Sequence, residues 1–288
     1  MRFGLHALGI GDGARREVID AVAAGAEDAG FATLWAGEHV VMVDEAESRY
    51  PYAADGRITV PAQADWLDPL LALSFAAAAT RTIRLGTGVL LLPEHNPVML
   101  AKQVASLDAL AGGRFALGIG VGWSREEFDA LGIPFGRRGA RADEYLDAMR
   151  TIWRDDVASF QGRFVSFHGI RVNPKPPRER RVPVIVGGNS DAALRRVARR
   201  GDGWYGFNLD GAEHVRDRLA RLRRLCCELG RDPAEIEIAV ALVDPRPADV
   251  RELEQLGVDE LVLVAAPPSD PAQVGEWLHG LRRAPEQA

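Results

Sequence analysis

Three histidines lie where the sequence predicts strands to end, and an imidazole in such a place can do chemistry. His6 belongs to the first strand-like run, His39 follows the second run and His95 follows the third. Because an unperturbed imidazole has a pKa of about 6.5, it can give or take a proton at neutral pH. Glu38 directly precedes His39, so an acidic side chain lies next to this histidine at the predicted strand end. A purely structural hydrogen bond is the alternative for His39, and packing is favoured over catalysis for His6.

Glycines gather at the same strand ends. Residues 83–123 read as two β-rich runs around a helix that Asn96-Pro97 opens and Gly112-Gly113 closes. His95 therefore either faces a pocket or belongs to the start of this helix. Since glycine in or after a strand costs stability, it usually marks a bulge or a close approach of the backbone to a ligand. The glycines that predict a flat or phosphorylated cofactor here are Gly86, Gly88, Gly118, Gly120 and Gly122.

A second glycine motif, Gly187-Gly188-Asn189-Ser190, leads from a predicted strand directly into a predicted helix over 191–200. Free backbone N–H groups and the positive end of a helix dipole bind anions without a basic side chain. We therefore expect a phosphate site, in which Asn189 or Ser190 also caps the helix. Asp191 in the first helical turn carries a charge that opposes an anion.

The elements that must position these residues alternate regularly along the chain. Strand-like runs separated by helix-patterned segments lie at residues 3–8, 31–36, 83–92, 115–121, 182–186, 203–207, 236–243 and 260–264. Eight βα units in 288 residues are typical of an α/β fold, the (β/α)8 TIM barrel, with an open doubly wound sheet as the alternative. Val40–Asp65 and Trp123–Arg181 are long insertions after strands 2 and 4, which predict a lid and a pocket wall. We expect a single domain over 1–288.

Composition limits the partners of such a protein. A formal charge of −6 and a pI of about 5.6 argue against nucleic acid, which needs a basic surface. No apolar run approaches the roughly 18 residues of a membrane span, and the N-terminus lacks the pattern of a secretion signal. Cys226 and Cys227 are adjacent and cannot staple a fold, which predicts a reduced, cytoplasmic protein.

Three stretches resemble one enzyme superfamily. GFATLWAGEHV (30–40), IRLGTGVLLLPEHNPVMLAKQVASLDALAGGRFALGIGVGW (83–123) and VPVIVGGNSDAALRRVARRGDGWYGF (182–207) are similar to the luciferase-like flavin enzymes. They resemble most closely the branch of coenzyme F420-dependent oxidoreductases, in which a deazaflavin exchanges a hydride with a small organic substrate. The resemblance implies this cofactor, with FMN as the alternative because both branches share most signatures. It also implies a homodimer.

The resemblance further implies roles for individual residues. By it, His39 lies near the reactive carbon of the deazaflavin as proton donor or acceptor, and Glu38 is a second catalytic group or a hydrogen-bond partner of the ring. Gly88-Val89 matches the place of a bulge with a non-prolyl cis peptide behind the ring, and an ordinary glycine bulge is the alternative. The other implied cofactor-binding positions are Leu91, Val121, Gly122, Gly187, Gly188, Asn189 and Ser190.

The implied substrate pocket contains Trp123, Phe207 and His95. Sugar-phosphate dehydrogenases of the family carry Glu in place of Trp123 and a Thr–Lys pair after the sixth strand, where residues 206–210 of this chain read GFNLD. This difference implies an uncharged, fairly apolar substrate. Two basic runs could hold the polyglutamate tail of F420, although a solvated surface is the simpler explanation. The first run is Arg137, Arg138 and Arg141, and the second is formed by the arginines of 171–181.

Three other functions stay open from the sequence. An FMN-dependent monooxygenase would need a loop-shielded pocket. A metal-dependent barrel hydrolase would have to use His6, His39 and His95, but the chain lacks a His-x-His strand motif, and we expect no metal site. A non-catalytic cofactor-binding relative is the third possibility. Metal analysis and spectral titration with F420 and FMN distinguish these functions.

Overall fold

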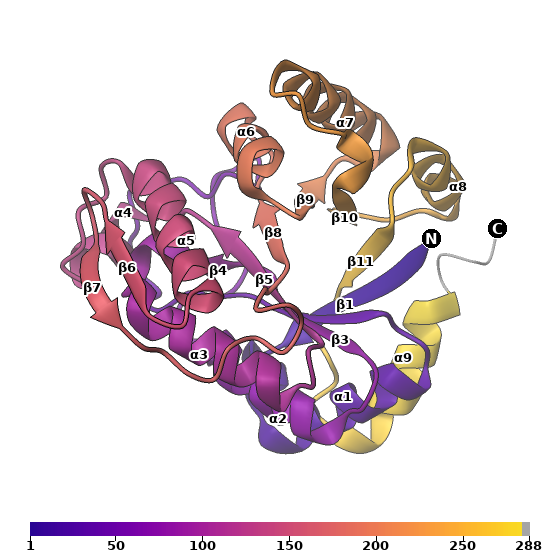
Figure 1. Cartoon of the computed structure of the whole chain (residues 1–288). Helices are drawn as coiled ribbons and strands as arrows, with labels where there is room; N and C mark the ends of the chain where they lie inside the picture. Colours follow the sequence, from indigo (N-terminus) through magenta and orange to yellow (C-terminus); the bar gives the residue numbers. More distant parts are fainter. Residues whose placement is uncertain (284–288) are drawn as a thin grey trace.

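The computed structural model describes residues 1–283, in which eight parallel strands close into a barrel (Figure 1). The pairing of β1 with β11 and of β3 with β5 completes the ring. The barrel strands are β1 (Arg2–Leu8), β2 (Thr33–Ala36), β3 (Arg84–Thr87), β5 (Phe115–Gly120), β8 (Val184–Gly187), β9 (Gly203–Leu209), β10 (Glu237–Leu242) and β11 (Glu260–Val264). The predicted TIM barrel is confirmed, and the open sheet is not formed.

Helices cover the outside of the barrel, and several begin where the sequence indicates. Asp68 caps α2 by accepting hydrogen bonds from the N–H groups of Leu70 and Leu71, and Asn96 caps α3 in the same way. The helices are α1 (Arg16–Asp28), α2 (Pro69–Ala79), α3 (Pro97–Leu110), α4 (Arg125–Ala130), α5 (Arg138–Arg154), α6 (Asp191–Arg200), α7 (Gly211–Glu228), α8 (Pro247–Leu256) and α9 (Val274–Arg283). Short 3-10 turns are η1 (Gly11–Ala14), η2 (Leu92–Glu94), η3 (Pro233–Glu235) and η4 (Pro271–Gln273). Across residues 1–283, no helix combines the length and the apolar character needed to cross a membrane.

The barrel interior is filled with side chains, which leaves the strand ends as the place for a ligand. Trp35 and Tyr205 stack at the centre with ring centroids 5.0 Å apart. The indole N–H of Trp35 and the hydroxyl of Thr33 each donate to the buried carboxyl of Glu260, both at 2.8 Å. Gly86 has to be glycine because a Cβ there would lie 2.6 Å from the Trp35 ring.

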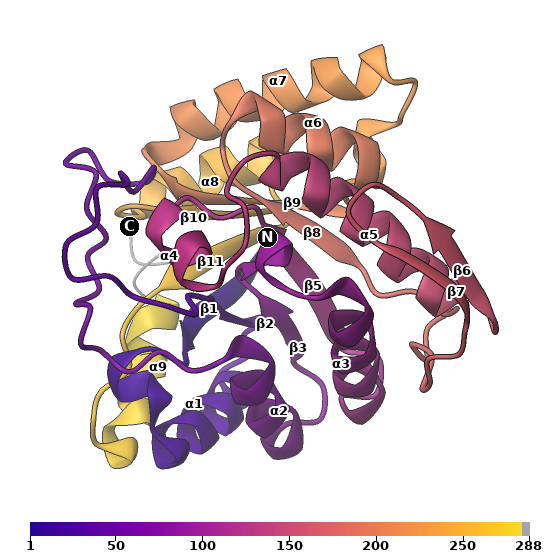
Figure 2. The same cartoon turned by 90° about the vertical axis from the view of Figure 1, so that its left-hand side faces the viewer.

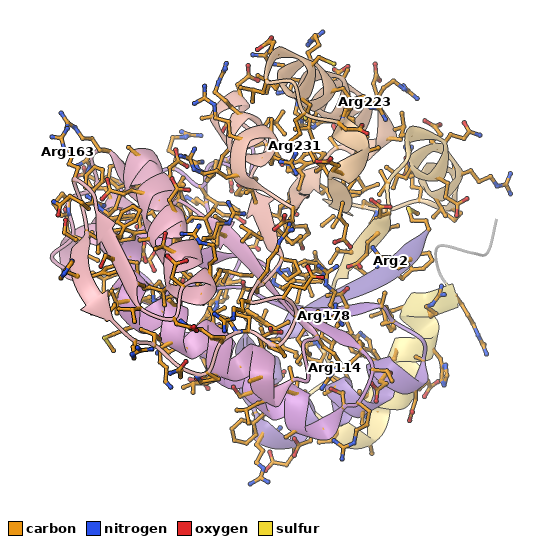
Figure 3. All side chains as sticks on the ribbon, viewed as in Figure 1. Arg2, Arg114, Arg163, Arg178, Arg223 and Arg231 are labelled. Atoms are coloured by element: carbon orange, nitrogen blue, oxygen red, sulfur yellow. The ribbon has the colours of Figure 1, made fainter. Side chains whose placement is uncertain are left out.

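Arginine ion pairs close the end of the barrel where the strands begin. Arg2 and Arg84 both donate to Glu237, at 2.5 and 2.7 Å. Arg114, just before β5, donates to the backbone oxygen of Ile83 at 2.7 Å. Figure 3 labels Arg2 and Arg114 at this end, together with Arg178. The opposite end, where the strands finish, carries the histidines and glycines that the sequence singles out.

The first predicted insertion and the start of the second lie at that opposite end. Residues 37–65 follow an irregular path past α4 toward β9, at the left of Figure 2. Glu126 of α4 accepts hydrogen bonds from the N–H groups of Glu47 and Ser48, and Asn208 of β9 donates to the backbone oxygen of Tyr52. The second insertion contains α4 and a hairpin formed by β6 (Ala158–Gln161) and β7 (Ser166–Ile170). Helix α4 was not predicted from the sequence.

Candidate functional site

A carboxylate–imidazole pair formed by Glu127 and His39 lies at the C-terminal end of the barrel. His39 Nδ1 donates to Glu127 Oε2 at 2.9 Å, and Glu127 Oε1 accepts from the N–H groups of Val40 and Val41 at 2.7 and 3.2 Å. Glu127 is completely buried. Because the carboxylate holds the hydrogen on Nδ1, the neutral imidazole presents a lone pair at Nε2. The indole N–H of Trp123 lies 3.4 Å from this atom.

Glu127 is a site residue that was not predicted from the sequence. It lies on the short helix α4, whose N-cap Ser124 accepts a hydrogen bond from the Glu127 N–H at 3.2 Å. The pattern Ser-x-x-Glu at 124–127 is a recognised helix-start signal. In this chain the glutamate side chain does not turn back to the cap but reaches His39. The sequence contains the helix-start signal, but it gives no indication of the contact between Glu127 and His39, which are 88 positions apart.

Glu38 pairs with His95 and not with its neighbour His39. Its carboxylate accepts from the N–H of Leu91 at 2.5 Å and from His95 Nε2 at 3.0 Å, and it is 6% exposed. Burial opposes the charged form of His95, but the hydrogen bond and the charge of Glu38 outweigh it and raise the His95 pKa above its ordinary value. Glu38 thus joins the end of β2 to β4 (Leu90–Leu91).

The Gly88-Val89 peptide is cis, as the resemblance implied, and it interrupts the third barrel strand between β3 and β4. The Val89 side chain lies between two glycines of neighbouring strands. A Cβ at Gly120 would be 2.7 Å from one Val89 methyl group, and a Cβ at Gly187 would be 2.6 Å from the other. Glycines on two strands therefore make room for a single apolar side chain at the top of the barrel.

His6 lies directly below this bulge. A Cβ at Gly88 would be 3.3 Å from His6 Cε1. His6 Nδ1 forms a 3.1 Å hydrogen bond with the Tyr205 hydroxyl, and burial lowers the His6 pKa to about 4. The imidazole is therefore neutral at physiological pH, which agrees with the expectation that His6 is packed.

The glycine motif before α6 has the geometry of an anion site. Ser190 is the N-cap and accepts from the N–H of Ala193, while the amide of Asn189 bonds both backbone groups of Phe207. Gly188 has a φ of 110°, which favours glycine. Asp191 pairs with Arg221 at 2.9 Å, so its charge is compensated. The open first turn of α6 can therefore receive a phosphate.

An aromatic wall surrounds the mouth of the barrel. The ring of Tyr50 lies 5.3 Å from Trp123, and the ring of Tyr52 lies 5.5 Å from Phe207, both edge to face. Trp66 packs its edge on His39 at 4.9 Å. Trp123 and Phe207 were predicted, whereas the three rings from residues 37–66 were not. In a helix or strand, periodicity shows which face a side chain points to. An irregular loop has no such periodicity, so the sequence could not indicate which of its aromatic residues face the site.

The first basic run does not form an arginine cluster at the mouth. Arg141 is 5% exposed and points to the Gly136 carbonyl and the Phe164 ring. Arg138 donates to the Gly122 carbonyl at 2.9 Å, and Arg137 is exposed. The idea that Arg141 meets an exposed acidic tail is therefore wrong, because its guanidinium is buried.

The three histidines at the strand ends do not converge. His6 bonds Tyr205, His39 bonds Glu127 and His95 bonds Glu38. Within the described part of the chain, no group of three His, Cys, Asp or Glu side chains is arranged to hold a metal ion. A cleft of about 370 Å³ lies at the other end of the barrel, beside the residues that precede β9, and its arginines are largely paired with acidic neighbours.

These residues fit a flat cofactor that carries a phosphate. Val89 offers an apolar surface, and the start of α6 offers backbone N–H groups. Val121 and Gly122 follow β5 beside them, and the φ of 76° at Gly122 is a backbone shape that favours glycine. Leu91, also predicted, is buried in β4 and is held by Glu38 through its N–H.

Comparisons with known proteins show the family to which the chain belongs. The family model described as luciferase-like monooxygenase matches residues 3–253. An uncharacterized protein of Mycobacterium tuberculosis is 34% identical over 238 residues, which cover 82% of this chain and 83% of that protein. The FMNH2-dependent dimethylsulfone monooxygenase of Pseudomonas putida is 34% identical over 149 residues, 51% of this chain and 40% of the relative.

A solved structure extends the likeness over nearly the whole chain. The coenzyme F420-dependent tetrahydromethanopterin reductase of Methanopyrus kandleri superposes with a TM-score of 0.75 and 16% identity, over 98% of this chain and 97% of the reductase. At this identity the likeness is one of fold. The fold, the motifs and the family match together show that the protein is an oxidoreductase of the luciferase-like monooxygenase family.

Proposed function

We propose that the protein is an F420-dependent oxidoreductase that moves a hydride between the deazaflavin and a small, uncharged organic substrate. The observation that carries the proposal is the pairing of His39 with the fully buried Glu127 at the strand end next to the Val89 bulge. A fixed Nδ1–H leaves Nε2 to give or take a proton at the mouth, where the aromatic wall keeps water away.

The chain's own residues would bind and orient the cofactor. When bound, a deazaflavin supplies a carbon that gives or accepts a hydride and reacts poorly with oxygen. Gly88-Val89 would support the ring, and the first turn of α6 at Asn189-Ser190 would bind the phosphate. Glu38, which uses both oxygens within the protein, would hold Leu91 and His95 in place and would not touch the substrate.

The substrate class follows from the wall around the mouth. Tyr50, Tyr52, Trp66, Trp123 and Phe207 present rings, and Asn208 uses its amide on the loop backbone. Such a surface suits an apolar molecule with a single polar group near His39. A cytoplasmic location, where Cys226 and Cys227 stay reduced, is part of the same proposal.

A homodimer is also part of the proposal. Helix α2 contains no charged residue, and it exposes Leu71 and Phe75. Leu73, Ala76 and Ala77 of the same helix are buried inside the subunit and are not free to meet a partner. A second copy would cover the outer face of α2 instead.

An FMN-dependent monooxygenase is the second candidate, because the Pseudomonas relative that matches half of this chain is named for FMNH2.

The deciding experiment is a spectral titration of tag-free apoprotein with each cofactor. We expect F420 to bind with a Kd of about 1 μM or tighter, roughly −8 kcal/mol, and FMN to bind weakly or not at all. F420 affinity should fall only modestly with salt, because Arg137 is the only arginine of the first basic run whose side chain is exposed to meet the tail. Stoichiometric FMN binding without F420 binding would favour the monooxygenase.

A further inference from the structure

Glu94, the last residue of η2, is a buried carboxyl group that the proposed function does not use. It is 8% exposed, and among residues 1–283 neither of its oxygens has a hydrogen-bond partner. Buried polar groups are nearly always paired, so an unpaired one requires a physical explanation. An ionised carboxylate without a partner would be especially costly at such a place.

Two other buried carboxyl groups, those of Glu38 and Glu127, lie close enough to Glu94 for their charges to act on it, and both already have their partners. Glu38 accepts from Leu91 and His95, and Glu127 accepts from His39 and two backbone N–H groups. A Cβ at Gly122 would lie 3.0 Å from Glu94 Oε1, which places the carboxyl against the backbone that follows β5. The three carboxyl groups therefore share one buried region at the top of the barrel.

The cations nearest to this region are directed elsewhere. Helix α5 packs against η2 and carries Arg138 and Arg141. Arg138 donates to the Gly122 carbonyl and lies over the Phe135 ring, while Arg141 is directed to Gly136 and Phe164. Burial, and then the charges of Glu127 and Glu38, raise the pKa of Glu94 to about 9.

We propose that Glu94 is a positioning residue, held as a neutral carboxylic acid, that sets the charge balance of the His39–Glu127 and His95–Glu38 pairs. While Glu94 is neutral, two carboxylates face two imidazoles. When its proton leaves to solvent, a third negative charge enters the same buried region and changes the environment of both rings. The inference rests on the proposed function at one point only, which is that His39 gives or takes the proton in the reaction.

The test uses apoprotein labelled with ¹⁵N in its histidine rings, so it needs no cofactor. His39→Asn and His95→Asn variants assign the two rings. In wild-type protein we expect both rings to show a second inflection in their nitrogen shifts near pH 9, beyond their own titration. Glu94→Gln, which keeps the neutral shape, should lose the second inflection and keep the first.

Two further variants complete the test. Glu276→Gln removes an exposed carboxyl on α9 and should titrate like wild type. Glu94→Asp keeps an acid and should shift the second inflection without removing it. A second inflection that persists in Glu94→Gln, or that is absent from wild type, would overturn the proposal. Failure of F420 to bind would instead contradict the proposed function and leave this titration unaffected.

Discussion

At the scale of residues, neighbours in the sequence have different partners. Glu38 and His39 are adjacent, yet Glu38 bonds His95 and His39 bonds Glu127. Side chains of successive residues in extended backbone point to opposite sides, so adjacency predicts separation and not pairing. The sequence identified His39, Glu38 and His95 as candidates, but their partners depend on segments that only the fold brings together.

His39 should contribute to chemistry more than to binding. A proton donor that acts mainly in the transition state contributes about 10²–10⁴-fold, so His39→Ala should lower turnover by that factor with little change in cofactor affinity. Glu127→Gln keeps the shape of the pair but removes its charge, and it should lower turnover by less. The measurement is steady-state kinetics together with F420 titration of each variant. Full activity of His39→Ala would remove His39 from the mechanism.

Glu94 should make stability depend on pH in a defined window. Its pKa in the folded protein is raised from 4.5 to about 9, so between these values the folded state holds a proton that the unfolded state has lost. The free energy of unfolding contributed by Glu94 therefore falls as pH rises through this window and levels off above it. Relative to Glu94→Gln, the wild-type Tm should decrease steadily from pH 4.5 to about 9. A constant difference in Tm across the window would show that Glu94 is ionised throughout.

At the scale of elements, the regular parts were predicted and the irregular parts were not. The regular alternation of strand-like runs and helix-patterned segments predicts the eight barrel strands. Asp68, Asn96 and Ser190 are N-cap residues that mark the starts of three helices. Helix α4 is only six residues long and has no apolar period to reveal it. The cis bond at Gly88-Val89 came from the family resemblance, since backbone shape of this kind leaves no mark in composition.

The glycine of β8 should be essential for the fit of the bulge. Gly187→Ala would place a methyl group 2.6 Å from Val89 Cγ1, and overpacking of this kind costs about 1–3 kcal/mol. We expect a lower free energy of unfolding in urea and weaker cofactor binding. Gly275→Ala is the matched control, because a Cβ there meets nothing within 4 Å. Equal stability and cofactor binding in the two variants would contradict the close contact between β8 and the bulge.

At the scale of the whole molecule, the two ends of the barrel carry different kinds of side-chain pairs. Partly exposed ion pairs such as Arg84–Glu237 lie where the strands begin, and the carboxylate–imidazole pairs lie where they finish. The sequence predicted the barrel and the chemistry-bearing end. It could not predict that Arg141 is buried, because charge patterns in sequence do not distinguish a covered helix face from an exposed one.

The apolar outer face of α2 should be the contact between two copies. Phe75→Glu places a charge on this face, where Phe75 is 46% exposed, and should convert a dimer into a monomer. Val157→Glu changes a comparably exposed residue, 48%, on the far hairpin and should leave the dimer intact. Light scattering coupled to size-exclusion chromatography measures the mass of each. A monomeric wild-type protein would refute the proposed dimer.

The irregular segment 37–65 contributes Tyr50 and Tyr52 to the mouth, whereas Val89, Gly120 and Gly187 belong to the barrel itself. Because loops tolerate exchange far better than packed strands, this division lets evolution alter one set of contacts and conserve the other. A relative could acquire a different substrate by replacing this one segment, and its cofactor would remain the same. Diversity among such enzymes should therefore be greatest here and least around the bulge.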